Sequence, residues 1–259
     1  MSKASASILL CAAALLAPAS LRAEPAVVAL ARAYLGPQST LDAIASIHYV
    51  GVLDRLDPTR GEKSSVHASL DLTFVKPMSQ RLVARGEKVT MTTVLDGYDA
   101  WDLVRDNNDP TKYRLRWLPA NDIKTLRANT WENLSYYRVP EGGSIEDKGP
   151  ATVDDVVCER VDFSHGPGIL YERYFDRDTG RLVLTVMGQE TFRETGEIRV
   201  DGVRFPKTII SRTKTSSGKE IVSTATFDSI VLNEPTTPGM FAVPDLTPPK
   251  KGAAPAAGK

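Results

Sequence analysis

Strict alternation of apolar and polar residues is the clearest pattern in the chain. Between Val66 and Phe74 every second residue is apolar, and the four residues between them are polar or charged. Lys112–Trp117 repeats this alternation. A period of two predicts β-strands with one buried and one solvated face. Weaker runs of the same kind predict further strands at 47–53, 79–86, 89–95, 100–105, 156–163, 168–175, 181–187, 191–200, 203–213 and 219–232.

Short turn signals separate these runs. They are Asp-Gly at 96–97, Asp-Arg-Asp-Thr-Gly at 176–180, Asp-Gly at 201–202 and Ser-Ser-Gly at 216–218. The first lies inside TVLDGYDAWDLVRD (93–106), which predicts a hairpin with Trp101 on its returning strand, because tight hairpin turns need φ > 0. Many strands joined by short turns predict one large antiparallel sheet.

Two segments carry a helical pattern instead. Residues 25–35 (PAVVALARAYL) begin with proline and stop before a glycine, and a second short helix is predicted to end at Ala45. Residues 121–134 place apolar side chains along one stripe, with Asn121 as the expected cap. A sheet with one apolar face must be covered or must close on itself. The helices are the available cover, so the predicted fold class is mainly β, of the α+β type.

The first 23 residues have the order of a secretory signal peptide. A charged start precedes the apolar run ASILLCAAALLAPA, and the small residue Ala23 ends the segment. This order predicts export with cleavage after Ala23, and the run is too short and too close to the terminus to favour a membrane anchor. Cys11 lacks the preceding small residue that lipid attachment needs. We therefore expect a periplasmic protein with an ordinary signal peptide.

The rest of the chain is expected to form one domain and a tail. No linker or internal repeat divides residues 24–244, while residues 245–259 are rich in Pro, Ala, Gly and Lys and predict disorder. Removing residues 1–23 leaves 30 basic and 32 acidic residues, which excludes the basic excess typical of nucleic-acid binding. Cys158 is then the one remaining cysteine, so no intramolecular disulfide is expected.

Patterns for catalysis or metal binding are weak. His48, His67 and His165 have no second histidine or cysteine at metal-ligand spacing. A solvated face explains the acidic residues around 156–163, and the dipeptide Ser164-His165 is not a nucleophile–base arrangement. No glycine-rich loop precedes a helix to hold phosphates. We therefore expect no metal, no cofactor and no enzyme activity.

Large apolar side chains concentrate on the expected sheet instead. Those assigned to one face of it are Phe74, Met78, Trp101, Tyr113, Trp117 and Phe175. The simpler interpretation is a packed core. The other is a concave apolar cavity, partly roofed by the helices, of the kind that binds apolar ligands. The first five of these residues are the candidate ligand-binding residues.

Four motifs follow one another in order: FVKP (74–77), TVLDGYDAW (93–101), DGVRFPKTI (201–209) and FDSIVLNEPTTPGMFAVP (227–244). In their order and spacing they resemble the LolA/LolB-like superfamily of periplasmic lipoprotein carriers and outer-membrane lipoprotein-sorting proteins. The resemblance implies a curved antiparallel sheet that forms a half-open barrel, with the N-terminal and central helices over its concave apolar face. It also implies a soluble carrier that holds lipid or lipoprotein acyl chains and meets the lipoprotein machinery of the inner or outer membrane.

The motif around Pro77 departs from the family at two positions. Carriers have an arginine before this proline and an aromatic residue shortly after it, where this chain has Lys76 and Gln80. Lysine keeps the charge but loses the planar fork of donors. Lys76 and Pro77 are therefore candidate carrier-motif positions. The resemblance also implies that Phe241 is buried in a closing edge segment.

Two other functions stay open. Related half-barrels act as protein-interaction or envelope-stress sensor modules without lipid cargo, and an open sheet edge would then accept a partner strand. An enzyme on the same scaffold is the third hypothesis, which a cavity with converging polar groups would favour.

Overall fold

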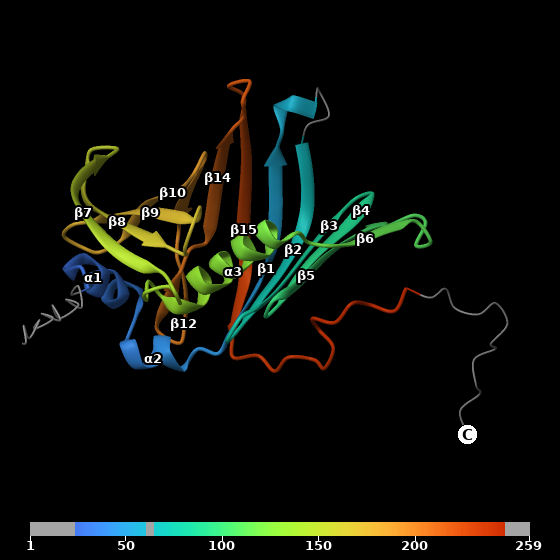
Figure 1. Cartoon of the computed structure of the whole chain (residues 1–259), viewed down its shortest axis with the longest axis horizontal. Coiled ribbons are helices and arrows are strands. Elements are labelled where there is room, and N and C mark those ends of the chain that lie inside the picture. Colours follow the sequence, from blue (N-terminus) through green and yellow to red (C-terminus); the bar gives the residue numbers. More distant parts are fainter. Residues whose placement is uncertain (1–23, 61–64, 247–259) are drawn as a thin grey trace, which may run out of the picture.

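The computed structural model describes residues 24–60 and 65–246 (Figure 1). The predicted signal peptide and residues 247–259 of the predicted tail lie outside this part. Within it, no helix is long and apolar enough to cross a membrane.

One antiparallel sheet of 13 strands dominates the described part of the chain. From edge to edge its strands are β6 (Tyr113–Trp117), β5 (Asp99–Asp106), β4 (Val89–Asp96), β3 (Ser79–Gly86), β2 (Ser65–Val75), β1 (Ser46–Leu56), β15 (Glu220–Leu232), β14 (Thr208–Lys214), β11 (Glu190–Thr195), β10 (Leu182–Met187), β9 (Leu170–Asp176), β8 (Val156–Ser164) and β7 (Ser144–Val153). The long β15 pairs with β1 and with β14, and so joins two meanders, β1–β6 and β7–β11 with β14. The predicted mainly β, antiparallel fold is confirmed.

Helices and a small hairpin complete the fold. They are α1 (Ala26–Leu35), α2 (Gln38–Ala43), α3 (Ala120–Ser135), the 3₁₀ turn Pro58–Arg60, and the hairpin of β12 (Ile198–Val200) and β13 (Val203–Phe205). Figure 1 shows α3 lying across the sheet between the two meanders. The predicted cap of α3 at Asn121 is wrong, because Pro119 precedes the helix and no side chain caps it.

The local predictions failed where backbone chemistry interrupts a strand. The run predicted at 191–200 divides at Gly196, which has φ +66°, and the run at 203–213 divides at Pro206, which has no amide hydrogen to donate. β7 was not predicted, because Gly149 and Pro150 break its alternation. Its pairing with β8 makes it a strand all the same, with a bulge at Asp147/Gly149.

The predicted hairpin around Asp-Gly is confirmed. Asp96 pairs with Asp99, so the two turn residues are Gly97, at φ +63°, and Tyr98. The turn therefore begins one residue later than the dipeptide suggested. This register pairs Val94 with Trp101, and it fixes which side of the sheet Trp101 faces.

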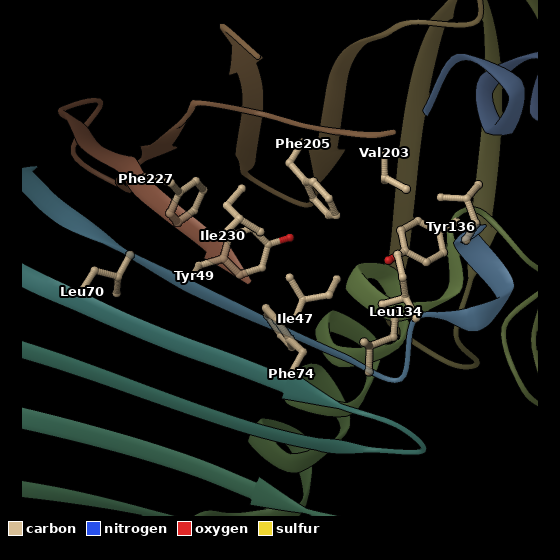
Figure 2. Packing of buried hydrophobic residues seen from close by; sticks show 12 residues of the cluster. Ile47, Tyr49, Leu70, Phe74, Leu134, Tyr136, Val203, Phe205, Phe227 and Ile230 are labelled. Carbon is tan, nitrogen blue, oxygen red and sulfur yellow. The ribbon is translucent and has the colours of Figure 1, made fainter. Parts of the chain in front are cut away.

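The main core lies between the sheet and the α2–α3 side. Figure 2 shows Phe74 of β2 near Leu134 at the end of α3, with Tyr49 and Phe227 of the next two strands farther from Leu134 in the same cluster. The ring centroids of Tyr49 and Phe227 are 4.8 Å apart. A second cluster packs α1 against β8 and β9, around Phe163 and other buried side chains.

Contacts of α3 favour a sheet that bends around this helix. Thr130 donates to Gln80 of β3, and Glu132, two residues later, pairs with Arg173 of β9. These strands are seven spacings apart in the sheet, which in a flat sheet corresponds to roughly 34 Å. Side chains from one turn of helix do not bridge that distance. The half-open barrel itself stays a prediction.

Candidate functional site

The strand register separates β2–β5 into two faces of different chemistry. We call the side that carries Phe74 and Ala100 the helix-side face, because α3 packs there: Leu95 and Ala100 form a cluster with Leu126 and Trp131 of α3. The opposite side, which carries Trp101, is the outer face. Since Trp101 follows Ala100 directly in a strand, the two side chains point to opposite faces.

Cross-strand pairs on the helix-side face form successive rows leading away from α3. From the helix outward they are Phe74–Gln80–Leu95–Ala100, then Leu72–Leu82–Thr93–Asp102, then Leu70–Ala84–Met91–Val104, then Ala68–Gly86–Val89.

Exposure rises along these rows on β3 and β4, whereas Leu70 and Ala68 of β2 stay buried. The first row is buried, and Leu72 and Leu82 of the second are half-buried. Met91 in the third row is 49% exposed and Val89 in the fourth is 40% exposed, while Val66 at the end of β2 is 44% exposed. Adjacent exposed apolar side chains on one face are characteristic of binding surfaces. We call Leu72, Leu82, Met91, Val89 and Val66 the open apolar rows.

An ion pair borders the open apolar rows at the edge of the sheet. Arg116 of β6 donates from Nε to Asp102 Oδ2 at 2.7 Å. The hydrogen bond and charge of Asp102 raise the pKa of Arg116. Asp102 Oδ1 is buried and has no hydrogen-bond partner in the described part of the chain. At this edge the open apolar rows therefore meet an ion pair of Asp102 and Arg116, whose charges cancel, and one free acceptor atom, Asp102 Oδ1.

Buried charges join α3 to β9 and to the loop after β8. Glu132 lies 2.5 Å from His165 Nε2 and also pairs with Arg173, and all three side chains are less than a tenth exposed. Burial alone would lower the pKa of Arg173, but the Glu132 carboxylate outweighs it and raises that pKa. The rings of Tyr137 and Phe163 lie 4.8 and 4.9 Å from the guanidinium. In the middle of α3, Arg127 donates to Gly97 O at 2.5 Å.

The five predicted ligand-binding residues do not share one face of the sheet, and their role in ligand binding stays a prediction. Phe74 and Met78 are buried on the helix-side face, in two different clusters. Trp101 is 5% exposed on the outer face and donates to Phe241 O at 3.2 Å. Tyr113 and Trp117 pair with Arg105 and Trp101, so both face outward on the edge strand.

Exposure also separates the predicted residues. Tyr113 is 46% and Trp117 is 62% exposed, so neither lines a closed cavity. Phe241 is half-buried against the Trp101 cluster, in a segment that is not a strand. It therefore covers the outer face instead of closing an edge.

The carrier-motif positions lie in the turn between β2 and β3. Lys76 and Pro77 are exposed there. Partial desolvation, and then the neighbouring Arg138 guanidinium, lower the pKa of Lys76, while Asp42 opposes this. Lys76 thus lies where α2 and the end of α3 approach the sheet.

The remaining titratable groups mostly have partners. Among the described residues, no group of three or more His, Cys, Asp or Glu side chains could hold a metal ion. His48 lies 2.6 Å from Glu234, and Asp162 and Glu159 of the acidic strand pair with Arg160 and Arg177.

Sequence reasoning missed Met91, Leu82, Asp102 and the charges around α3. The β4–β5 hairpin register relates Met91 to Asp102, but the dipeptide at 96–97 indicates a turn one residue early, and Leu82 lies in β3, outside this hairpin. The partners of Glu132 come from β9 and the loop after β8. The sequence of α3 contains no pattern that predicts these two partners.

Similarity to known proteins is structural. No family model and no curated protein matches the chain by sequence. A LolA superfamily protein from Nitrosomonas europaea is similar at 12% identity, with 84% of this chain and 96% of that chain covered and a TM-score of 0.54. A DUF1329 family protein from Desulfovibrio piger has 11% identity, coverage of 83% and 95%, and a TM-score of 0.53.

A protein domain from Vibrio parahaemolyticus, named for outer membrane lipoprotein sorting, has 6% identity, coverage of 83% and 95%, and a TM-score of 0.54. At such low identity the likeness concerns the fold alone. Together with the 13-stranded antiparallel sheet and its crossing helix, these matches show that the chain has the fold of the LolA superfamily and of the lipoprotein-sorting domain.

Proposed function

We propose that the protein binds an acyl chain of a lipid or lipoprotein on the open apolar rows beside α3. The observation that carries this proposal is the rise in exposure from Phe74 to Leu82 to Met91 along one apolar face. An acyl chain placed there would cover side chains that α3 leaves in contact with water. Removing apolar area from water contributes about 25 cal/mol per Å².

A carrier role agrees with the fold. The similar structures include a LolA superfamily protein and a domain named for outer membrane lipoprotein sorting. We propose by analogy that this protein carries its ligand through the periplasm, after cleavage of the signal peptide near Ala23, and exchanges it with membrane lipoprotein machinery. Fold-level likeness supports this role as an analogy.

Binding without chemical conversion fits the composition of the rows. They present mainly methyl and methylene groups, and the charges that border them, Asp102 and Arg116, neutralise each other. A general base needs a reactive group within hydrogen-bond reach of its substrate. We therefore propose a non-enzymatic binding protein.

Native mass spectrometry of the protein from a periplasmic extract, followed by solvent extraction, tests this function. We expect a discrete added mass that extracts as lipid. Met91→Asp should abolish it, because a carboxylate in the third row cannot be desolvated against an acyl chain. Val231→Asp is the matched control, since Val231 is 40% exposed but pairs with His48 and faces outward. An unchanged lipid load in Met91→Asp would reject the site.

A second function is favoured by the edge strand β6. Lys112 and Leu118 are bonded to β5 by their backbones, so alternation directs the amides of Tyr113, Leu115 and Trp117 away from the sheet. The other edge strand, β7, is protected by a bulge and by Pro150. β6 could thus accept an extended partner segment, as a protein-interaction module would.

Hydrogen exchange would test strand addition at β6. A peptide of alternating glutamate and valine complements Arg114 and the exposed aromatic residues of this strand. We expect it to protect the amides of Tyr113, Leu115 and Trp117 if β6 is a docking edge. Unchanged exchange at saturating peptide would count against this second function.

A further inference from the structure

The outer face carries a cavity that is separate from the open apolar rows. It has a volume of about 620 Å³ and lies between strands β3–β5 and the segment Thr237–Pro244. Trp101 and Leu103 form part of its floor, and Met240 forms part of its roof. The hydrogen bond from the Trp101 indole to Phe241 O holds the roof over the floor. Volumes of about 300–1,000 Å³ are typical of small-molecule sites.

The strand register brings two arginines into this cavity. Arg81 of β3 pairs with Val94, which pairs with Trp101, so Arg81 and Trp101 share the outer face. Arg105 lies four residues after Trp101 in β5 and therefore points the same way. Both arginines line the cavity.

The charge of the cavity is not balanced. None of the described residues that line it is an aspartate or glutamate. Among the described residues, the Nε of Arg105 is buried without a hydrogen-bond partner. A buried donor without an acceptor costs about 1–3 kcal/mol, and more when it is charged.

Arg81 is only weakly neutralised. Its nearest carboxylate, Asp71, lies 3.8 Å away. The same carboxylate also faces Arg85 at 3.9 Å and His48 at 3.5 Å. Asp71 therefore serves three basic side chains, and its charge is shared among them.

We propose that this cavity binds a small organic anion, a phosphate or carboxylate that carries an apolar group. The anion would accept hydrogen bonds from Arg81 and Arg105, and the apolar group would lie against Trp101 and Met240. Guanidinium groups match such anions, because their planar forks donate two parallel hydrogen bonds.

Titration calorimetry with phenyl phosphate and with benzyl alcohol, on protein expressed from the full sequence, tests the charge requirement. We expect phenyl phosphate to bind, benzyl alcohol not to bind, and the affinity to fall as salt is raised. Arg105→Gln should weaken binding at least tenfold, and Arg81→Gln should also weaken it. Arg85→Gln is the matched control, because Arg85 lies on the same strand and face but outside the cavity.

Two further readouts locate the site and identify its natural source. In a Trp117→Phe, Trp131→Phe background, phenyl phosphate should change the emission of Trp101. Loss of phosphatidylglycerol-vesicle binding in Arg105→Gln would identify a lipid headgroup as the source, whereas loss of phenyl phosphate binding alone would identify a soluble anion. Both outcomes support the anion site. Failure of the wild-type protein to bind both phenyl phosphate and phosphatidylglycerol vesicles would overturn it, as would equal losses of phenyl phosphate affinity in Arg105→Gln and Arg85→Gln.

Discussion

The two faces of strands β2–β5 share one backbone and one register, yet they differ in chemistry and in cover. The helix-side face is mainly apolar, and the 16-residue α3 leaves Met91 and Val89 on it exposed. The outer face carries arginines on β3 and β5 among apolar and threonine side chains, and an extended segment covers part of it. On the helix-side face, α3 leaves apolar side chains exposed, which an acyl chain could cover. On the outer face, the segment Thr237–Pro244 leaves a cavity beside two arginines, which an anion could fill.

Buried ion pairs hold α3, whereas apolar packing and one hydrogen bond hold the segment around Phe241. The largest effect on stability is therefore expected from a substitution in the ion pairs of α3. Glu132→Ala would leave Arg173 and His165 buried without their carboxylate. Losing one partner of a buried ion pair costs about 3–5 kcal/mol. Urea unfolding should show this loss, and an Arg173→Leu, Glu132→Leu double variant should recover much of it. A cost below about 1 kcal/mol for Glu132→Ala would mean that these charges do not hold α3.

The outer-face tryptophan should matter for stability and not for acyl binding. Trp101→Ala removes a buried indole from the cluster beneath Phe241 and should cost about 3 kcal/mol of unfolding free energy. The acyl-chain affinity per folded molecule should stay within twofold of wild type. A large loss of that affinity would place the acyl site on the outer face.

The segment around Phe241 should detach from the sheet at a lower free-energy cost than α3. Phe241→Ala removes a half-buried ring and should cost about 1–2 kcal/mol, less than full burial would imply. Trp101 emission should shift to the red as water reaches the indole. An unchanged emission would show that other residues of the segment hold it in place.

The smallest expected effect concerns pH and Lys76. Its folded pKa is lowered, so below that pKa the folded state holds the charged ammonium at a cost. Stability from this group therefore rises as pH increases from the folded pKa to the unfolded value. Lys76→Met should be more stable at neutral pH, by less than about 0.5 kcal/mol because solvent screens the site. The difference should close above pH 10.5, the ordinary lysine value. Denaturant titrations at neutral and alkaline pH would reveal it, and a gap that widens with pH would contradict the assignment.

The amino-acid pattern predicted most strands, because alternation depends on local sequence. It did not predict which face of β5 and β6 is covered. Trp101 and Trp117 are cross-strand neighbours, yet one is buried and the other exposed. The difference arises from Phe241, about 140 residues away in the chain, which packs with the Trp101 cluster.

The candidate site was only partly predictable for the same reason. Phe74 was placed correctly on the helix-side face by the pattern of β2, and Met91 followed only once the hairpin register was known. The charge around Arg105 depends on which carboxylates lie near it in the folded structure. The spacing of residues in the sequence does not predict these neighbours.

One measurement tests the acyl site most directly. Methionine methyl groups can be observed individually by NMR, and this chain has Met91 on the open apolar rows and Met240 over the outer-face cavity. Stearate with a nitroxide label on its chain should broaden the Met91 methyl signal and leave the Met240 signal intact. Broadening of Met240 with an intact Met91 signal would contradict acyl binding beside α3.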